Sequence, residues 1–372
     1  MNNKIRKSGH CKKILSPHYL CLLIPGYALL FVINGPYTPW NAFFWILPVW
    51  STVFIDLWSP KEHRQPSDGH MRVPFDLLLF TLAGLQFATI VLLIYMATQL
   101  SWTTMPEIIC SLVNIFAIKV VVGTSSSFSG IVVAHELIHR SNPVMHTLGR
   151  LLLSLECYEH FATEHIRGHH KNVGTNADPA TARLGESYEA FWKRTISSQF
   201  RSAWQLENKR LGITESTLYD HRLFYHHVAQ GLIFELLLLV TILWLFGIVA
   251  LLVFLMQAYA AVRKLETVNY IQHWGLTRNP EHGNRVLSWD TDSWFTLNTL
   301  VGLSRHSDHH KNAARPFHKL CYRSENPKLP YGYFTLVFLS VFSNKQFQKL
   351  VNRQLHRYGL KTHTVTTLNF ER

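Results

Sequence analysis

The sequence predicts an all-α integral membrane protein with six membrane-spanning helices, and three observations lead to this fold class. Charged residues make up only 16% of the 372 residues, whereas soluble domains usually carry about 25%. Uncharged apolar runs are longer than soluble core helices show, and basic residues gather beside alternate runs. An apolar content of 48% excludes a disordered chain. The cysteines have no C-x-x-C spacing, which excludes a disulfide framework, a zinc ribbon and an iron–sulfur site: Cys11, Cys21, Cys110, Cys157 and Cys321.

The first four spans are expected within residues 14–134. Residues 14–55 contain no charged side chain, and a spanning helix needs about 20 apolar residues. This stretch therefore predicts two helices joined by a turn at residues 35–39. Residues 77–106 and 108–134 predict the third and fourth spans. Buried helices of a large soluble protein are the alternative, which the length of these runs disfavours.

Residues 228–268 form the next apolar stretch, which is either one long helix or a hairpin of two spans that turns near Gly247. One helix would place the rest of the chain on the opposite side of the membrane, whereas a hairpin would return it to the same side. Glu235 lies within the stretch, where an ionisable group is costly and tends to face a cavity. The histidines on both sides of the stretch favour the hairpin, because they have to meet at one site.

Basic residues predict the orientation of the chain. Five of them precede the first apolar run, namely Lys4, Arg6, Lys7, Lys12 and Lys13, while loops 34–40 and 98–106 contain none. The positive-inside rule then places the N-terminus on the cytoplasmic side of the inner membrane, with a retained first helix rather than a cleaved signal. One domain is expected, with a cytoplasmic tail (1–13), four spans (14–134), a cytoplasmic segment (135–227), a hairpin (228–268) and a second cytoplasmic segment (269–372).

Four histidine clusters follow the expected cytoplasmic ends of the apolar stretches. They are His135-Glu136-Leu137-Ile138-His139, Glu164-His165-Ile166-Arg167-Gly168-His169-His170, Asn269-Tyr270-Ile271-Gln272-His273 and Arg305-His306-Ser307-Asp308-His309-His310. Residues four apart share one face of a helix. The pairs 135/139, 165/169 and 306/310 are therefore expected to present two imidazoles each to one ion. Nine imidazoles on one side of the membrane indicate a metal site.

Nine imidazoles exceed the ligand set of one zinc ion and fit two metal ions with open positions. Imidazole suits zinc, copper, iron and nickel. The carboxylate-rich di-iron pattern requires two Glu-x-x-His motifs, and only Glu136-x-x-His139 matches it. The acids of the clusters are therefore expected to orient imidazoles rather than bind metal, with solvated surface charges as the alternative: Glu136, Glu164 and Asp308.

In this order, the four clusters resemble the signature boxes of the membrane alkane hydroxylases (alkane 1-monooxygenases), within the fatty-acid desaturase and hydroxylase superfamily. The box around His273 and the string at residues 305–310 are the most selective of the four. Residues 178–183 and 329–333 also resemble that family. Three positions depart from the usual glutamate, tyrosine and glutamine of the family and leave the histidines intact: Gln272, Trp274 and Ser304.

The resemblance implies a non-haem di-iron monooxygenase that uses O₂ to hydroxylate the terminal carbon of a hydrocarbon (an n-alkane to a primary alcohol). Its implied metal ligands are His135, His139, His165, His169, His170, His273, His306, His309 and His310. A lipid desaturase, an aryl-methyl hydroxylase or a fatty-acyl hydroxylase of the same superfamily is the main alternative. A membrane zinc metalloprotease built on H-E-x-x-H would leave six histidines unexplained, and a non-catalytic metal carrier should place its ligands along a path across the membrane.

Monooxygenation consumes two electrons beyond those taken from the substrate. The sequence contains no G-x-G-x-x-G turn for a dinucleotide and no cysteine set for an iron–sulfur centre. We therefore expect a separate electron carrier, and the net charge of +13 favours an acidic one at the cytoplasmic face. The family resemblance suggests rubredoxin with an NAD(P)H-dependent reductase, and ferredoxin is the alternative carrier. No nucleic acid partner is expected.

Overall fold

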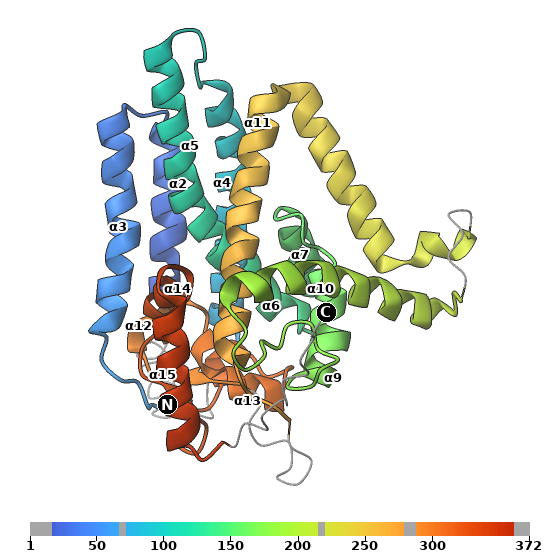
Figure 1. Cartoon of the computed structure of the whole chain (residues 1–372). Coiled ribbons are helices and arrows are strands. Elements are labelled where there is room, and N and C mark those ends of the chain that lie inside the picture. Colours follow the sequence, from blue (N-terminus) through green and yellow to red (C-terminus); the bar gives the residue numbers. More distant parts are fainter. Residues whose placement is uncertain (1–16, 67–71, 215–219, 279–287, 361–372) are drawn as a thin grey trace, which may run out of the picture.

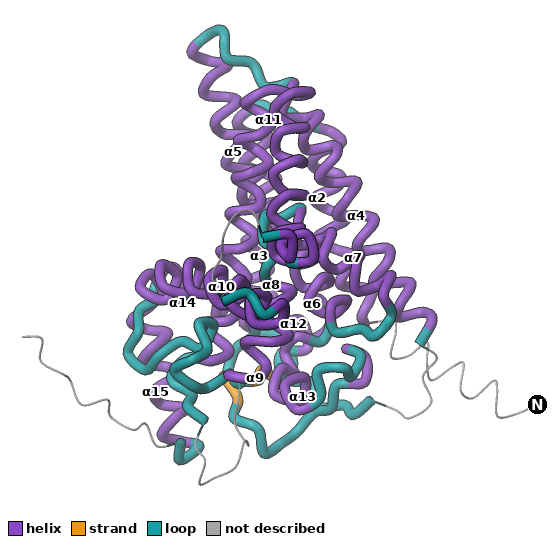
Figure 2. Tube along the Cα trace, turned by 90° about the vertical axis from the view of Figure 1, so that its right-hand side faces the viewer, coloured by secondary structure: helices purple, strands orange, loops and turns teal. Residues whose placement is uncertain are grey.

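The computed structural model describes residues 17–66, 72–214, 220–278 and 288–360, which are mainly helical, as predicted. Long helices stand side by side in the upper part of Figure 1, and shorter helices and loops form the lower part. Figure 2, turned by 90°, shows the same two levels. The predicted tail (1–13) and residues 361–372 of the last predicted segment lie outside the described residues.

The bundle at the top contains the first four long elements of the chain. They are α2 (Leu23–Asn34), which follows the short 3₁₀ helix η1 (Tyr19–Leu22), then α3 (Pro39–Leu57), α4 (Val73–Thr98) and α5 (Met105–Ser125). Local sequence sets the helix starts. The Thr38 side chain accepts the Asn41 N–H ahead of α3, and Thr104 and Glu107 form a capping box ahead of α5. Proline in the first turn of α3, α4 and α5 suits the helix start, because no intrahelical N–H is lost there.

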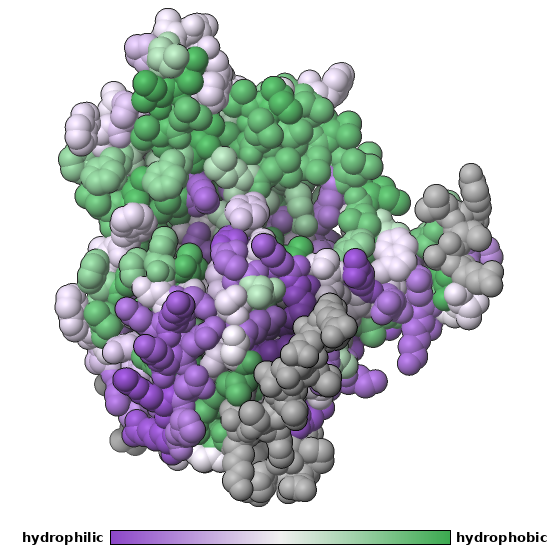
Figure 3. Space-filling model, in the orientation of Figure 1, coloured by the Kyte–Doolittle hydropathy of each residue, from purple (hydrophilic) through white to green (hydrophobic). Residues whose placement is uncertain are grey.

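Four helices in the described part of the chain are long and apolar enough to cross a membrane. They are Pro39–Leu57, Val73–Thr98, Met105–Ile138 and His227–His273, while the apolar helix Tyr19–Asn34 in the first predicted span is shorter. Apolar side chains cover the upper part of the surface in Figure 3, and polar ones gather below. Trp40 and Trp244 are 74% and 82% exposed, which suits a surface that faces lipid rather than water. The chain therefore has the build of an integral membrane protein.

Helix α11 (His227–His273) is broken at Gly247, whose φ of 82° and ψ of 178° are not helical. Glycine adopts positive φ readily because it lacks a Cβ atom. In Figure 1 the two arms of α11 meet at the top of the molecule, and both run down toward the lower part. The chain therefore reverses at the residue where the sequence predicts the turn of a hairpin.

The lower part is built mainly from short elements, together with the longer helix α10, on either side of α11. Before it come the π-helix η2 (Ser126–Val132), α6 (Val133–Ile138), α7 (Pro143–Ser154), α8 (Phe161–Glu164), the π-helix η3 (His165–His169), α9 (His170–Asn172), α10 (Tyr188–Leu211) and η4 (His221–Tyr225). After it come β1 (Asp290–Thr291), α12 (Trp294–Thr299), η6 (Leu303–Arg305), α13 (His306–Lys311), η7 (Phe317–Lys319), β2 (Lys328–Leu329), α14 (Tyr333–Phe342) and α15 (Asn344–Arg357). The two strands pair in parallel, with Asp290 opposite Lys328 and Thr291 opposite Leu329.

The buried carboxylate of Asp56, at the end of α3, ties the bundle to the lower part. Ser293 Oγ and Thr296 Oγ1 donate to Asp56 Oδ1 over 2.6 and 2.7 Å, and the Thr335 N–H donates to Oδ2 over 3.0 Å. A buried carboxylate is stable only when its oxygens are satisfied in this way. These hydrogen bonds fix α12 and α14 against the bundle and thereby position the histidine segments between the two levels.

Candidate metal centre

The structure brings all nine predicted histidines together in two adjacent groups. The first group is His135, His139, His165, His170 and His309, and the second group is His169, His273, His306 and His310. Within each group, one nitrogen of every ring lies within 4.8 Å of those of the other rings. The ring centroids of His165 and His169 are 5.2 Å apart, and those of His306 and His309 are 5.3 Å apart. The two groups therefore form one continuous cluster.

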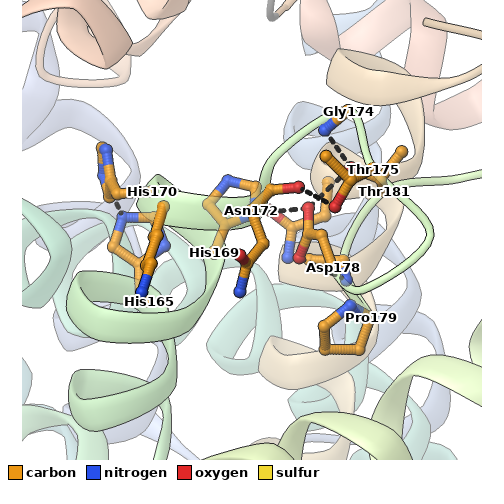
Figure 4. Close-up of polar contacts among 12 residues, drawn as sticks. His165, His169, His170, Asn172, Gly174, Thr175, Asp178, Pro179 and Thr181 are labelled. Atoms are coloured by element: carbon orange, nitrogen blue, oxygen red, sulfur yellow. Dashed lines mark hydrogen bonds and ion pairs between the residues drawn. The ribbon is translucent and has the colours of Figure 1, made fainter. Parts of the chain in front are cut away.

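The second histidine box is not an α-helix, which corrects the predicted pairing of its side chains. His165–His169 is a π-helix, whose wider turn aligns residues five apart rather than four. His165 therefore shares the first group with His170, and His169 faces the second group. Figure 4 shows His165 and His170 together, with His169 turned toward Asp178. The pairs 135/139 and 306/310 do fall within one group each, as predicted.

Burial gives these imidazoles the protonation state that a metal ligand needs. Removal from water, reinforced by the neighbouring rings, lowers the pKa far below the usual value for His165, His306, His309 and His310. Neutral imidazole has a free lone pair, and metal binding requires it. Several rings point these nitrogens at one another: His170 Nε2 lies 3.1 Å from His165 Nε2 and 3.2 Å from His309 Nε2.

The unsatisfied nitrogens show that the residues fit a bound cation. Among the described residues, His135 Nε2, His139 Nε2 and His169 Nε2 are buried without a hydrogen-bond partner. A buried polar atom without a partner costs about 1–3 kcal/mol. A cation bound in each group would be surrounded by converging lone pairs and would remove this cost. The donor set is rich in nitrogen and poor in carboxylate, which suits a transition metal rather than magnesium or calcium.

Asp178 contacts a histidine of the second group, and the sequence analysis did not assign it this role. His169 Nδ1 lies 2.9 Å from Asp178 Oδ2, and the Thr181 hydroxyl donates to the same oxygen over 2.6 Å. Although burial opposes both charges, their contact raises the pKa of His169 and lowers that of Asp178. The carboxylate holds the proton on Nδ1 and turns Nε2 toward the cluster. In the sequence, only its place in residues 178–183, which resemble the alkane hydroxylase family, pointed to Asp178.

The three acids expected to orient imidazoles make their hydrogen bonds elsewhere, and all three are buried rather than solvated. Glu136 Oε1 lies 2.5 Å from Arg140 Nη2 and accepts the Phe317 N–H. Asp308 binds two arginine side chains and the Cys321 N–H. Glu164 accepts a hydrogen bond from Ser202, and burial raises the pKa of Glu164 to about 8. Arg140 thus holds Glu136, and Arg315 and Arg323 hold Asp308, so neither carboxylate is directed at an imidazole.

Two of the three residues that depart from the family pattern, Gln272 and Trp274, anchor the segment of the third histidine box. Gln272 Nε2 donates to the Tyr333 hydroxyl over 2.9 Å, and Trp274 Nε1 donates to the Glu186 carbonyl over 2.9 Å. Ser304 is buried at the start of the fourth box. Glu235, the acid within α11, accepts the Glu159 N–H over 2.9 Å. Its role in this structure is therefore to satisfy a backbone group of the segment that leads into the second box.

Comparison with known proteins agrees with this architecture. Residues 111–337, more than half of the chain and including all nine histidines, match the fatty acid desaturase family. Alkane 1-monooxygenases 1 and 2 of Pseudomonas aeruginosa are 37% and 33% identical over 59% and 69% of this chain. The alkane 1-monooxygenase of Acinetobacter baylyi is 32% identical over 65% of it.

The matched part spans 58%, 69% and 61% of the length of these three relatives, in that order. The desaturase match covers all four histidine boxes, and the relatives share one printed name, alkane 1-monooxygenase. They confirm the resemblance drawn from the sequence. The chain therefore belongs to the fatty acid desaturase family and, within it, to the alkane 1-monooxygenases.

Proposed function

We propose that this protein is a non-haem di-iron monooxygenase that hydroxylates the terminal carbon of a membrane-dissolved hydrocarbon. The observation that carries this proposal is the pair of adjacent imidazole groups, five and four rings, at one end of an apolar helix bundle. Each group has enough nitrogen ligands for one ion of its own. The relatives are named alkane 1-monooxygenases, which favours iron and an n-alkane converted to a primary alcohol.

The nine histidines would hold the two irons, and the side chains around the irons have separate tasks. Two bound irons would supply the activation of O₂, by which one oxygen atom enters the C–H bond and the other leaves as water, with two electrons and two protons consumed. The buried rings stay neutral and keep their lone pairs directed inward. Asp178 orients His169, and Thr181 orients Asp178. The apolar side chains beside the rings exclude water and accept the hydrocarbon.

The proposed topology has six spans, with all 372 residues in one catalytic domain and the histidines on the cytoplasmic side of the inner membrane. The six are the helix Tyr19–Asn34, the helices Pro39–Leu57, Val73–Thr98 and Met105–Ile138, and the two arms of α11 on either side of Gly247. This arrangement is supported by the reversal at Gly247, because all four boxes then follow ends of spans on one side. The predicted positive-inside distribution supports the cytoplasmic assignment.

Electrons would come from a separate acidic carrier, rubredoxin or ferredoxin, with its NAD(P)H-dependent reductase. Helix α15 offers one basic surface for it, because Lys345, Lys349, Arg353 and Arg357 are all exposed. An acidic protein is steered to such a surface, and salt weakens the attraction. We expect no turnover with NADH alone and turnover with NADH, reductase and rubredoxin.

The zinc protease has no support from the described residues. Glu136, which would act as its general base, is paired with Arg140. His135 and His139 also lie among three other imidazoles of the first group, more than a zinc protease uses.

Product and metal analysis of the purified protein in lipid would test the proposal. We expect two irons per chain by elemental analysis, and a primary alcohol from n-alkanes by gas chromatography after incubation with the reductase and rubredoxin. A new double bond with no alcohol would assign the protein to the desaturases. One zinc per chain without iron would overturn the di-iron proposal.

A further inference from the structure

A small cavity lies where the apolar core of the bundle meets both histidine groups. Val132, Val301, Leu303 and Leu320 line it together with rings of His135 and His309 from the first group and His306 from the second. Glu136, which is held by Arg140 and the Phe317 N–H, is the remaining lining residue. Its free volume of about 10 Å³ is about the space of one water molecule. Val132, Val301 and Leu320 belong to the same apolar core as the membrane helices. The cavity therefore joins the apolar bundle to the cluster of rings.

Val301 adopts a backbone conformation that valine rarely shows. Its φ is +49°, and the next residue, Gly302, has a φ of +71°. A β-branched residue in this left-handed region is a genuine outlier, because its Cβ substituents crowd the backbone. Such strain persists only where the surrounding structure determines the conformation, and it gathers at functional sites. Here the strained residue is part of the cavity wall.

Several contacts fix this turn. The Cys21 thiol, from η1, donates to the Asn298 carbonyl over 3.0 Å. The Gly302 N–H donates to the Leu297 carbonyl over 3.0 Å. A Cβ atom on Gly302 would lie only 3.1 Å from the Phe317 carbonyl oxygen, so the turn is packed closely on its far side. The side chain of Val301 is thereby held toward the rings.

We propose that Val301 is the residue that restricts the reacting end of the hydrocarbon site to a terminal methyl group. This inference rests on the proposed function and deepens it. The isopropyl group is stiff about χ1, and the turn that carries it is fixed, so Val301 is a wall rather than a moving gate. The free volume beside the rings is no larger than one water molecule, so a chain can approach the rings only by its narrowest end, the terminal methyl group, and an internal or branched carbon needs more room.

Substitution at this position, followed by product analysis, would test the proposal. Val301→Ala removes two methyl groups from the wall and reduces the crowding of the backbone, because alanine has no β-branch. One methylene group more or less in an apolar pocket changes the preference between two competing substrates by about ten-fold or more. We therefore expect the ratio of subterminal to terminal alcohol from an n-alkane to rise by about ten-fold, with the iron content unchanged. Val301→Leu should fill the cavity and reduce turnover of all n-alkanes.

Two further variants make the result specific. Leu320→Ala enlarges the same cavity from another segment and should raise the same ratio, so it reports on the proposal even if the Val301 variants fold poorly. Val253→Ala, which creates a similar gap in the bundle core away from the cavity, should leave the ratio unchanged. An unchanged ratio in both Val301→Ala and Leu320→Ala, with wild-type protein still producing alcohol, would overturn this inference alone. Absence of alcohol from the wild-type protein would instead remove the proposed function and this inference with it.

Discussion

The two histidine groups are adjacent, yet the protein holds them differently. In the second group, Asp178 accepts a hydrogen bond from His169 and is itself held by Thr181. In the first group, the polar neighbours of His170 are other rings, at 3.1 Å from His165 and 3.2 Å from His309. We infer that Asp178 preorients His169 of the second group, whereas the rings of the first group, like His306 and His310, whose Nε2 atoms lie 3.0 Å apart in the second, depend more on the metal to bring them into place.

The elements that supply the rings explain this difference. The first group comes from α6, the π-turn with α9, and α13, all of them short. The second group includes His273, the last residue of α11, whose neighbours Gln272 and Trp274 are hydrogen-bonded to Tyr333 and to the Glu186 carbonyl. The long anchored helix thus supports His273 and the buried carboxylate supports His169, while His306 and His310 lie on α13, the helix that also carries His309 of the first group.

Removal of one ligand from each group should give the largest contrast. His273→Ala leaves three imidazoles in the second group, whereas His139→Ala leaves four in the first. We expect His273→Ala to lose one iron per chain and to reduce hydroxylation by more than the roughly 100-fold that loss of an outer hydrogen-bond partner causes. His139→Ala should retain more iron. The exposed His356 on α15 provides the matched alanine control, and equal iron loss in both variants would contradict the comparison.

Acid should destabilise the metal-free protein through the first group more than through the second. Outside the helices long enough to cross a membrane, burial lowers the pKa of four rings of the first group, His139, His165, His170 and His309. In the second group it does so for His306 and His310, whereas Asp178 raises that of His169. A lowered pKa means that the unfolded chain binds protons first as the pH falls below about 6.5. Stability is complete above that pH and falls by up to about 1.4 kcal/mol per pH unit for each such ring.

Thermal unfolding of the metal-free protein between pH 7.5 and 5 would measure this effect. His165→Phe, which removes one of the first-group rings, should flatten the dependence on pH. His169→Phe should not flatten it, because the folded-state pKa of His169 is raised. An unfolding temperature at pH 5 equal to that at pH 7.5 would show that the rings are not buried in their neutral form.

Loss of the Asp178 carboxylate should affect the second group selectively. Asp178→Asn removes the charge that fixes the His169 tautomer, and such outer partners are typically worth 10–100-fold in metal affinity. We expect one of two irons to become labile toward a chelator while the other is retained. Asp56→Asn, at a buried carboxylate that binds hydroxyl and backbone groups instead, should lower stability without a selective loss of iron. Simultaneous release of both irons from Asp178→Asn would argue against separate support of the groups.

The sequence predicted those structural elements that depend only on residues close together in the chain. Apolar runs without charge predicted the long helices, and Gly247 marked the reversal of α11, because glycine alone tolerates that φ. The nine histidines were found from their spacing and from the family resemblance. Their division between the groups could not be predicted, because the π-turn at His165–His169 depends on packing around the second box.

Sequence patterns also could not predict the contacts between segments that are distant in the chain. Glu136 lies within a histidine box, yet it pairs with Arg140 and the Phe317 backbone. Asp178 lies nine residues from His169 in a non-helical segment, and no periodicity relates the two. The strained turn at Val301 has no signature beyond the adjacent Gly302. In each case the partner is chosen by tertiary geometry rather than by residue spacing.

The smallest expected effect concerns the outermost link of the second group. Thr181 Oγ1 donates to Asp178 over 2.6 Å and accepts the Gly174 N–H over 2.9 Å. Thr181→Val keeps the shape of the side chain but removes both hydrogen bonds, each worth about 0.5–1.5 kcal/mol. We expect a loss of iron affinity of a few-fold at the second group, well below that of Asp178→Asn, measured by chelator competition.

Thr52→Val, which removes a hydroxyl bonded to Val49 within α3, serves as the matched control. If Thr181→Val matched Asp178→Asn, the threonine rather than the carboxylate charge would set the position of His169. If it equalled the control, Asp178 would be held by its remaining contacts, of which the Ala180 N–H at 3.0 Å from Oδ1 is one.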